Sequence, residues 1–194
     1  MLVEAVEIIR ALWEGEYVTY RGAHFDVEGA KVFDLPVSPP PLGIAVSGKQ
    51  SCGLAGELAD LVIATEPKAE LIQMFQEAGG TGKPAVGQTA VCWGPDAAAC
   101  RALATEQFGW SLGGWKIQAE LPNTVNFEAF GQVVTEEAVA AKVPCGPDTA
   151  KIVEGVKPFV DAGFTEVALI QIGQNQAEFC DYFQRELGPA LRAL

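Results

Sequence analysis

Residues 41–66 read PLGIAVSGKQSCGLAGELADLVIATE, and this stretch decides the fold. It holds an apolar run over 42–46 that ends in Ser47-Gly48, and a second run over 61–64 that ends in Thr65. The segment between the two runs has the apolar spacing of a short helix. Short apolar strands that alternate with helices are typical of parallel strands covered on both faces. We therefore predict a strand–helix–strand unit here.

The same rhythm continues toward the carboxyl end. Apolar runs over 86–93 and 167–172 predict two more strands, which makes four parallel strands in all. Residues 109–133 interrupt the rhythm with tryptophan and phenylalanine among Gly, Pro and Asn, so we interpret them as an insertion with a functional or capping role. Helices are predicted over 50–58, 67–78, 96–108, 135–142, the segment from Asp148 to about Val160, and 176–187.

On the amino-terminal side, residues 2–13 have the apolar spacing of an amphipathic helix, and Gly15 follows as its stop. Residues 16–36 favour a short, irregular hairpin that contains the single histidine, His24. The proline-rich stretch 36–41 cannot be helical.

Four parallel strands form either a small open sheet or part of a barrel. Small polar residues end the strands, as at barrel active sites, and the chain starts with a helix and hairpin as if in the middle of a repeating unit. We therefore expect the α/β class, as the C-terminal half of a (β/α)8 TIM barrel. The expected single partial domain covers 1–194, with a helix over 1–15, a hairpin and Pro-rich connection over 16–40, βα units over 41–108, the insertion over 109–133, and final helices and a strand over 134–194.

Composition excludes several classes of function. Apolar residues make up 49% and charged residues 20% of the chain, which is ordinary globular composition. The net charge of −12 argues against nucleic acid and anionic lipid as partners. No apolar stretch is long enough to span a membrane, and the first residues lack the basic region of a signal peptide. The five cysteines include no C-x-x-C pair, so we expect reduced thiols in a cytoplasmic protein and no metal site.

Two predicted strand ends carry residues suited to an anion. Ser47-Gly48-Lys49 lies where a strand enters a helix, so its N–H groups could cradle a phosphate. The alternative is a plain βα turn, and it is favoured in the absence of a full phosphate-binding motif. Thr65 and Lys68 repeat the arrangement at the next strand. There the alternative is a cap at Thr65 and a solvated lysine at Lys68.

Other polar residues give weaker signals. Lys142 lies in an apolar segment, where its long stem could reach a phosphate or simply extend to solvent. His24 has no neighbouring triad pattern and is interpreted as a surface or hairpin residue. Glu136-Glu137 is interpreted as the acidic first turn of a helix. We assign no catalytic residue and no metal ligand.

Several segments nevertheless resemble the luciferase-like flavin and deazaflavin oxidoreductases, in the branch of F420-dependent glucose-6-phosphate dehydrogenase. The most specific is the series of a helix, W-x-G, Y-x-G, P-P-P and a strand in residues 1–48. The resemblance extends over essentially the whole chain and includes the segments VEAVEIIRALWEGEYVTYRGAHFDVEGAKVFDLPVSPPPLGIAVSG, LADLVIAT, PCGPD, FVDAGFTEVALIQIG and FCDYFQRELGPALR.

The resemblance implies a (β/α)8 barrel and hydride transfer between a substrate carbon and C5 of coenzyme F420. It places Ala45, Val46, Ser47 and Gly48 against the cofactor and its phosphate, although this stretch is richer in glycine in the glucose-6-phosphate enzymes. Thr65 and Lys68 match positions that hold the substrate phosphate, and Lys142 is a looser match to another.

The family's acid/base histidine, tryptophan, glutamate and non-proline cis peptide come from earlier strands and have no counterpart here. We therefore expect a truncated chain, inactive alone, that forms a homo-oligomer or pairs with a missing N-terminal half and acts on a small molecule. Two alternatives remain open: an FMN-dependent monooxygenase of the same superfamily, and a non-catalytic remnant that binds an anion or dimerises.

Overall fold

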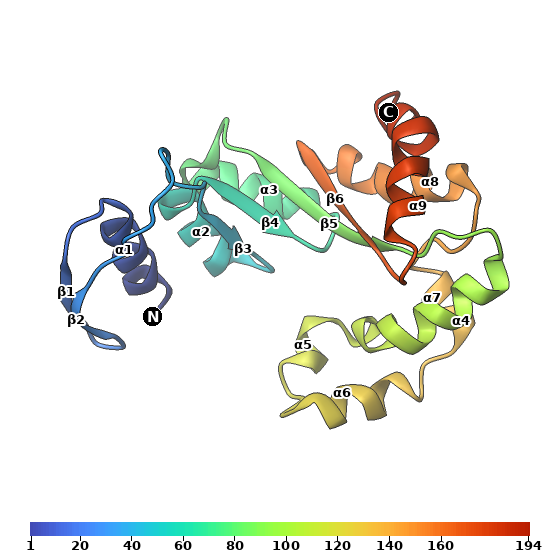
Figure 1. Ribbon diagram of the computed structural model, residues 1–194, viewed down its shortest axis with the longest axis horizontal. Helices are drawn as coiled ribbons and strands as arrows, with labels where there is room; N and C mark the ends of the chain where they lie inside the picture. The colour runs from blue at the N-terminus through green and yellow to red at the C-terminus, as the bar shows by residue number, and fades with distance from the viewer. The chain divides into compact units, whose positions relative to one another are not determined.

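The computed structural model describes all residues, 1–194, and has an α/β fold with four parallel strands and flanking helices. The chain divides into two compact units: the first holds residues 1–64 and 68–86, and the second holds 65–67 and 87–194. Figure 1 shows the helices and strands of both units. None of the helices is both long enough and apolar enough to cross a bilayer.

The first unit begins with a helix and a hairpin and continues with the βα rhythm. Its elements are α1 (Leu2–Trp13), β1 (Val18–Arg21), β2 (Asp26–Ala30), β3 (Gly43–Ala45), α2 (Lys49–Leu58), β4 (Leu61–Ala64), α3 (Ala69–Phe75) and the wide turn η1 (Gln76–Gly80). Strand β5 (Ala85–Val91) starts in this unit and ends in the second.

The second unit adds one named strand and most of the helices. Its elements are α4 (Ala97–Phe108), η2 (Gly109–Gly113), α5 (Gly114–Gln118), α6 (Thr124–Gly131), α7 (Glu136–Ala140), α8 (Thr149–Asp161), β6 (Glu166–Gln171), α9 (Gln176–Tyr182), η3 (Phe183–Leu187) and α10 (Gly188–Leu191).

The strand order β3-β4-β5-β6 confirms the predicted parallel sheet. Strands β3 and β4 pair in parallel, with Ile44 opposite Val62. In the second unit the Ile172 N–H donates to the Val91 carbonyl at 2.8 Å, just beyond the end of β6. The predicted α/β class with four parallel strands and flanking helices is therefore confirmed.

Helix α1 and the antiparallel β1–β2 hairpin are confirmed (Figure 1). Carboxylates of α1 join the two. The Glu4 carboxylate accepts the N–H groups of Ala23, His24 and Phe25 at 3.0–3.2 Å. The His24 N–H bond is the main cause that lowers the pKa of Glu4. The His24 side chain itself is exposed in the turn between the strands, as predicted.

Helix α2 is held in the first unit by one ion pair and one close approach. Arg10 Nη2 donates to Asp60 Oδ1 at 2.9 Å, and Asp60 Oδ2 accepts the Leu42 N–H at 2.8 Å. A Cβ added to Gly56 would lie 2.6 Å from the Ala78 Cβ. Only glycine therefore lets α2 approach the turn after α3 this closely.

Two apolar clusters form the core of the second unit. One gathers around Cys92, Val139 and Ala104, where α4 and α7 meet the end of β5. The other is centred on Val91 and Tyr182, with the Trp93 ring stacked on Tyr182 at 4.5 Å. Both clusters bury side chains contributed by distant parts of the chain.

Three expectations are corrected. The helix predicted from Pro67 begins at Ala69, because Lys68 keeps an extended backbone (φ −109°, ψ 116°). The segment 109–133 is largely helical, as η2, α5 and α6. Strands β3 and β6 are not buried on both faces. In each strand more exposed side chains alternate with more buried ones, and Ile170 of β6 is 36% exposed.

Candidate functional site

The carboxyl end of β3 forms a short polar turn into α2. Ala45 ends the strand with its side chain exposed, and Val46 is buried and donates its N–H to the Ile63 carbonyl at 2.8 Å. Ser47 and Gly48 follow, and Gly48 is the N-cap of α2. We call residues 46–48 the β3–α2 turn. The strand–turn–helix arrangement predicted for them is confirmed.

The Ser51 hydroxyl organises this turn. It accepts the Ser47 N–H at 3.1 Å and the Gly48 N–H at 3.3 Å, and it donates to the Gly48 carbonyl at 3.0 Å. This is the reach-back bond of a capping box, supplied here by serine. Those two backbone donors are therefore already engaged, so an anion at the turn must use the donors that follow them.

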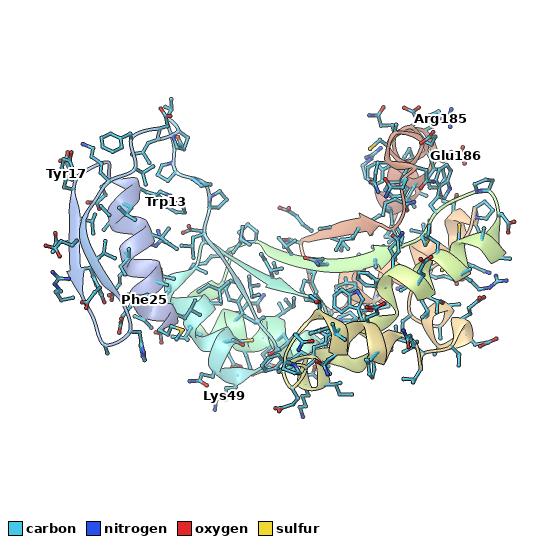
Figure 2. All side chains as sticks on the ribbon, turned by 60° about the horizontal axis from the view of Figure 1, so that its bottom comes forward. Trp13, Tyr17, Phe25, Lys49, Arg185 and Glu186 are labelled. Atoms are coloured by element: carbon cyan, nitrogen blue, oxygen red, sulfur yellow. The ribbon has the colours of Figure 1, made fainter.

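The following donors are the first N–H groups of α2. The first bond of the helix runs from the Cys52 N–H to the Gly48 carbonyl at 3.0 Å, so Lys49, Gln50 and Ser51 have no acceptor inside the helix. A Cβ on Gly48 would meet nothing within 4 Å, so the space above the turn is open. Figure 2 shows the Lys49 side chain extending from the start of α2. The helix dipole and this ammonium both favour an anion here.

The end of β4 makes a second, different turn. Thr65 follows the strand directly and is exposed, and Lys68 is the exposed N-cap of α3. Thr65 does not cap α3, because the helix starts four residues later at Ala69. The division of the chain runs between Pro67 and Lys68, so Thr65 lies in the second unit and Lys68 in the first.

Lys142 lies in neither turn. It is exposed, and it precedes the segment whose Cys145 pairs in parallel with Cys92. It lines a cavity of about 420 Å³ between α4, α7 and α8. We call this cavity the Cys145 groove; its lining residues are Arg101, Ala140, Ala141, Lys142, Pro144, Cys145, Lys151, Glu154 and Gly155.

Three cations and one carboxylate line the Cys145 groove. Arg101 comes from α4, Lys151 from α8, and Lys142 from the connection after α7, while Glu154 is the single acid. The lining of the groove is therefore net positive, although the whole chain has a net charge of −12. The groove is therefore suited to a small anionic ligand.

Cys145 lines this groove, and two buried thiols, Cys92 and Cys100, lie behind it. The Cys92 thiol hydrogen-bonds with Cys145, and this bond and burial raise the pKa of Cys92. The same bond lowers the pKa of Cys145, burial opposes the effect, and the charges of Arg101 and Lys151 lower it further. Cys100 also contacts Cys92 and is buried. No group of His, Cys, Asp or Glu side chains is arranged to hold a metal ion.

Sequence reasoning missed Arg101, Lys151 and Cys145 as members of a site. Arg101 and Lys142 are far apart along the chain, and Lys151 follows the Gly146-Pro147-Asp148 helix start. No spacing rule links residues on different helices, so only the fold could bring them together. The free, buried state of Cys52, Cys92 and Cys100 was predicted, whereas Cys180 is exposed.

Comparison with known proteins places the chain in a family. Residues 1–166 match the family model described as luciferase-like monooxygenase. The chain belongs to the luciferase-like monooxygenase family.

Relatives of this luciferase-like chain include proteins named as F420-dependent dehydrogenases. It is 29% identical to the F420-dependent glucose-6-phosphate dehydrogenase of Nocardia farcinica, over 100% of this chain and 61% of the relative. It is 30% identical to the F420-dependent hydroxymycolic acid dehydrogenase of Mycobacterium tuberculosis, over 98% of this chain and 54% of the relative. The chain thus spans about 60% of the length of such relatives.

A solved structure of an F420-dependent secondary alcohol dehydrogenase, in complex with an F420-acetone adduct, superposes with a TM-score of 0.78. It is 22% identical and is matched over 99% of this chain and 61% of its own. At this identity the likeness supports the luciferase-like fold alone.

Proposed function

We propose that this chain takes part in F420-dependent oxidoreduction of a small molecule. F420 supplies the two-electron chemistry, a hydride moving between a substrate carbon and C5 of the deazaflavin. The observation that carries the proposal is the β3–α2 turn, which has open space above Gly48 and N–H groups at the start of α2 without acceptors inside the helix. The similarity to an F420-dependent dehydrogenase covers the whole chain, this turn included.

Residues of the turn have separate tasks in this proposal. The exposed side chain of Ala45, at the end of β3, and the backbone of Val46 form a wall against the cofactor. Ser47 and Gly48 hold the backbone in the shape that opens the start of α2. The N–H groups of Lys49, Gln50 and Ser51, with the Lys49 ammonium, bind its phosphate. Gly48 fits this task because a side chain there would fill the open space above the turn.

Thr65 is proposed to bind an anionic group of the substrate through its hydroxyl, and Lys68 is proposed, separately, to bind one through its ammonium. The similarity to the glucose-6-phosphate branch supports each assignment. Lys142 is proposed to bind an anion as well, with Arg101 and Lys151 as its neighbours in the Cys145 groove. We also propose a cytoplasmic location, since five unpaired thiols suit a reducing compartment, and self-association of the chain.

Titration with F420 and, separately, with FMN tests the proposal. We expect F420 absorbance and fluorescence to change on binding, and Lys49→Gln to weaken the affinity about threefold to fivefold through loss of one exposed charge. Lys157→Gln, which removes a lysine ion-paired on α8, is the charge-matched control and should bind as the parent does. Tighter binding of FMN, or binding of neither cofactor, would contradict the proposal.

A further inference from the structure

We propose that the Cys145 groove is a thiol-modification site, at which an anionic low-molecular-weight disulfide oxidises Cys145 and Cys92 to a protein disulfide. The site lies entirely within the second unit. It does not depend on cofactor binding, since none of its residues belongs to the β3–α2 turn, although it shares the groove's cations with the anion-binding task proposed for Lys142.

The first argument is the position of the two cysteines. Cys92 and Cys145 are direct partners in a parallel bridge, with the Cys92 N–H donating to the Pro144 carbonyl and the Gly146 N–H donating to the Cys92 carbonyl, both at 2.9 Å. Neighbouring strands lie about 4.8 Å apart. Disulfides join Cα atoms about 4.4–6.8 Å apart, so this pair is within reach of a bond.

The second argument is that the two thiols differ in access. Cys92 is 1% exposed, whereas Cys145 is half-buried and lines the groove. A reagent in the groove therefore reaches Cys145 first and cannot reach Cys92 directly. This is the arrangement of an attacking thiol with a resolving thiol behind it.

The third argument is the surroundings of Cys145. Thiolates, not thiols, are nucleophiles, and nearby cations favour them. Arg101 and Lys151 face Cys145 from α4 and α8, and both lower the pKa of the Cys145 thiol, after the larger effect of its hydrogen bond with Cys92. The same cations attract a reagent that carries carboxylates. A cavity of about 420 Å³ has room for such a molecule.

The chemistry balances without a metal or an added cofactor. The Cys145 thiolate attacks one sulfur of the reagent RS–SR, forming a Cys145–SR bond and releasing RS⁻. The Cys92 thiol then attacks the Cys145 sulfur, and its proton passes to the departing thiolate, which leaves as RSH. Two protein thiols are oxidised to one disulfide, while the reagent disulfide is reduced to two thiols.

The test uses the full chain with Cys180→Ser, because Cys180 is exposed outside the groove and would react on its own. The protein is incubated with oxidised glutathione, an anionic disulfide, or with cystamine, a cationic one, and then mapped by peptide mass spectrometry. We expect a Cys92–Cys145 disulfide that reductant reverses. In Cys92→Ser the mixed disulfide should persist on Cys145, and Cys145→Ser should remain unoxidised.

A separate experiment tests the role of the groove's cations. Arg101→Gln with Lys151→Gln should lower the rate with oxidised glutathione about tenfold relative to cystamine, because only the anionic reagent loses attraction. The mapping of the parent protein does not depend on whether Cys92→Ser folds. A disulfide between Cys92 and Cys100, an unmodified Cys145, or an unchanged rate ratio in the double variant would each overturn the proposal.

Discussion

The β3–α2 turn and the Cys145 groove are both proposed to bind anions, but with different groups. At the turn the donors are backbone N–H groups at the start of α2, shaped by Ser51 within three residues of Gly48. In the groove the charges come from side chains on three separate segments. The first site is therefore tied to the stability of its own helix, whereas the second depends on tertiary packing and adds little to stability itself.

The largest change in the free energy of unfolding should come from the contact between α2 and the turn after α3, at Gly56. Gly56→Ala should destabilise the protein by about 2 to 3 kcal/mol, because the new Cβ would lie 2.6–2.7 Å from Ala78 atoms. Gly53→Ala, in the same helix with nothing within 4 Å, should instead stabilise it by about 0.8 kcal/mol. Urea unfolding of the two variants measures the contrast, and equal effects would show that the close approach to Ala78 is unimportant.

Removal of the Ser51 hydroxyl should have the next largest effect. Ser51→Ala should cost about 1 to 2 kcal/mol, because the Ser47 and Gly48 N–H groups lose their acceptor. F420 affinity should fall as well, because the turn loses its shape. Ser51→Thr keeps the hydroxyl and is the matched control. Thermal denaturation and F420 titration check both effects; parent-like behaviour of Ser51→Ala would separate the turn from the stability of α2.

Acid should weaken the bonds that the Asp60 carboxylate makes with Leu42 and Arg10. The Leu42 N–H bond, and then the Arg10 bond, lower the pKa of Asp60. Because the folded-state pKa lies below the unfolded value of about 3.9, this stabilisation is complete above that value and is lost as pH falls through the folded pKa.

Asp60→Asn should therefore cost about 1 kcal/mol at neutral pH, a modest figure because the Asp60 side chain is 42% exposed and its ion pair is screened. The difference from the parent should shrink as pH is lowered below about 4. Urea unfolding over this pH range measures it, and a difference that stays constant with pH would rule out the charge of Asp60 as the cause.

The smallest effect is expected in the groove. Lys142→Gln should change the free energy of unfolding by less than about 0.5 kcal/mol, since an exposed lysine among like charges holds no packing in place. Retention of an anionic dye or of phosphate should fall in the same variant. A clear loss of stability in thermal melts would mean that Lys142 holds α7 against its neighbours.

The local backbone around the proposed site could be predicted, and the long-range contacts could not. The sequence places Ser47, Gly48, Thr65 and Lys68 after apolar runs that end strands, and the structure has strand ends at Ala45 and Ala64. Their roles in binding stay a prediction. The helical character of 109–133 was missed, because its glycines and Pro122 hide three short helices, of which η2 and α6 pack against α4.

The sequence by itself determined the alternation of strands and helices, the α1–hairpin start and the polar strand ends, since periodicity, glycine and proline act locally on the backbone. Only the tertiary structure decided that Cys92 lies beside Cys145 and that Arg101, Lys142 and Lys151 surround one cavity. Such contacts depend on how parallel strands and their helices stack, and no local property of the chain encodes which distant side chains then become neighbours.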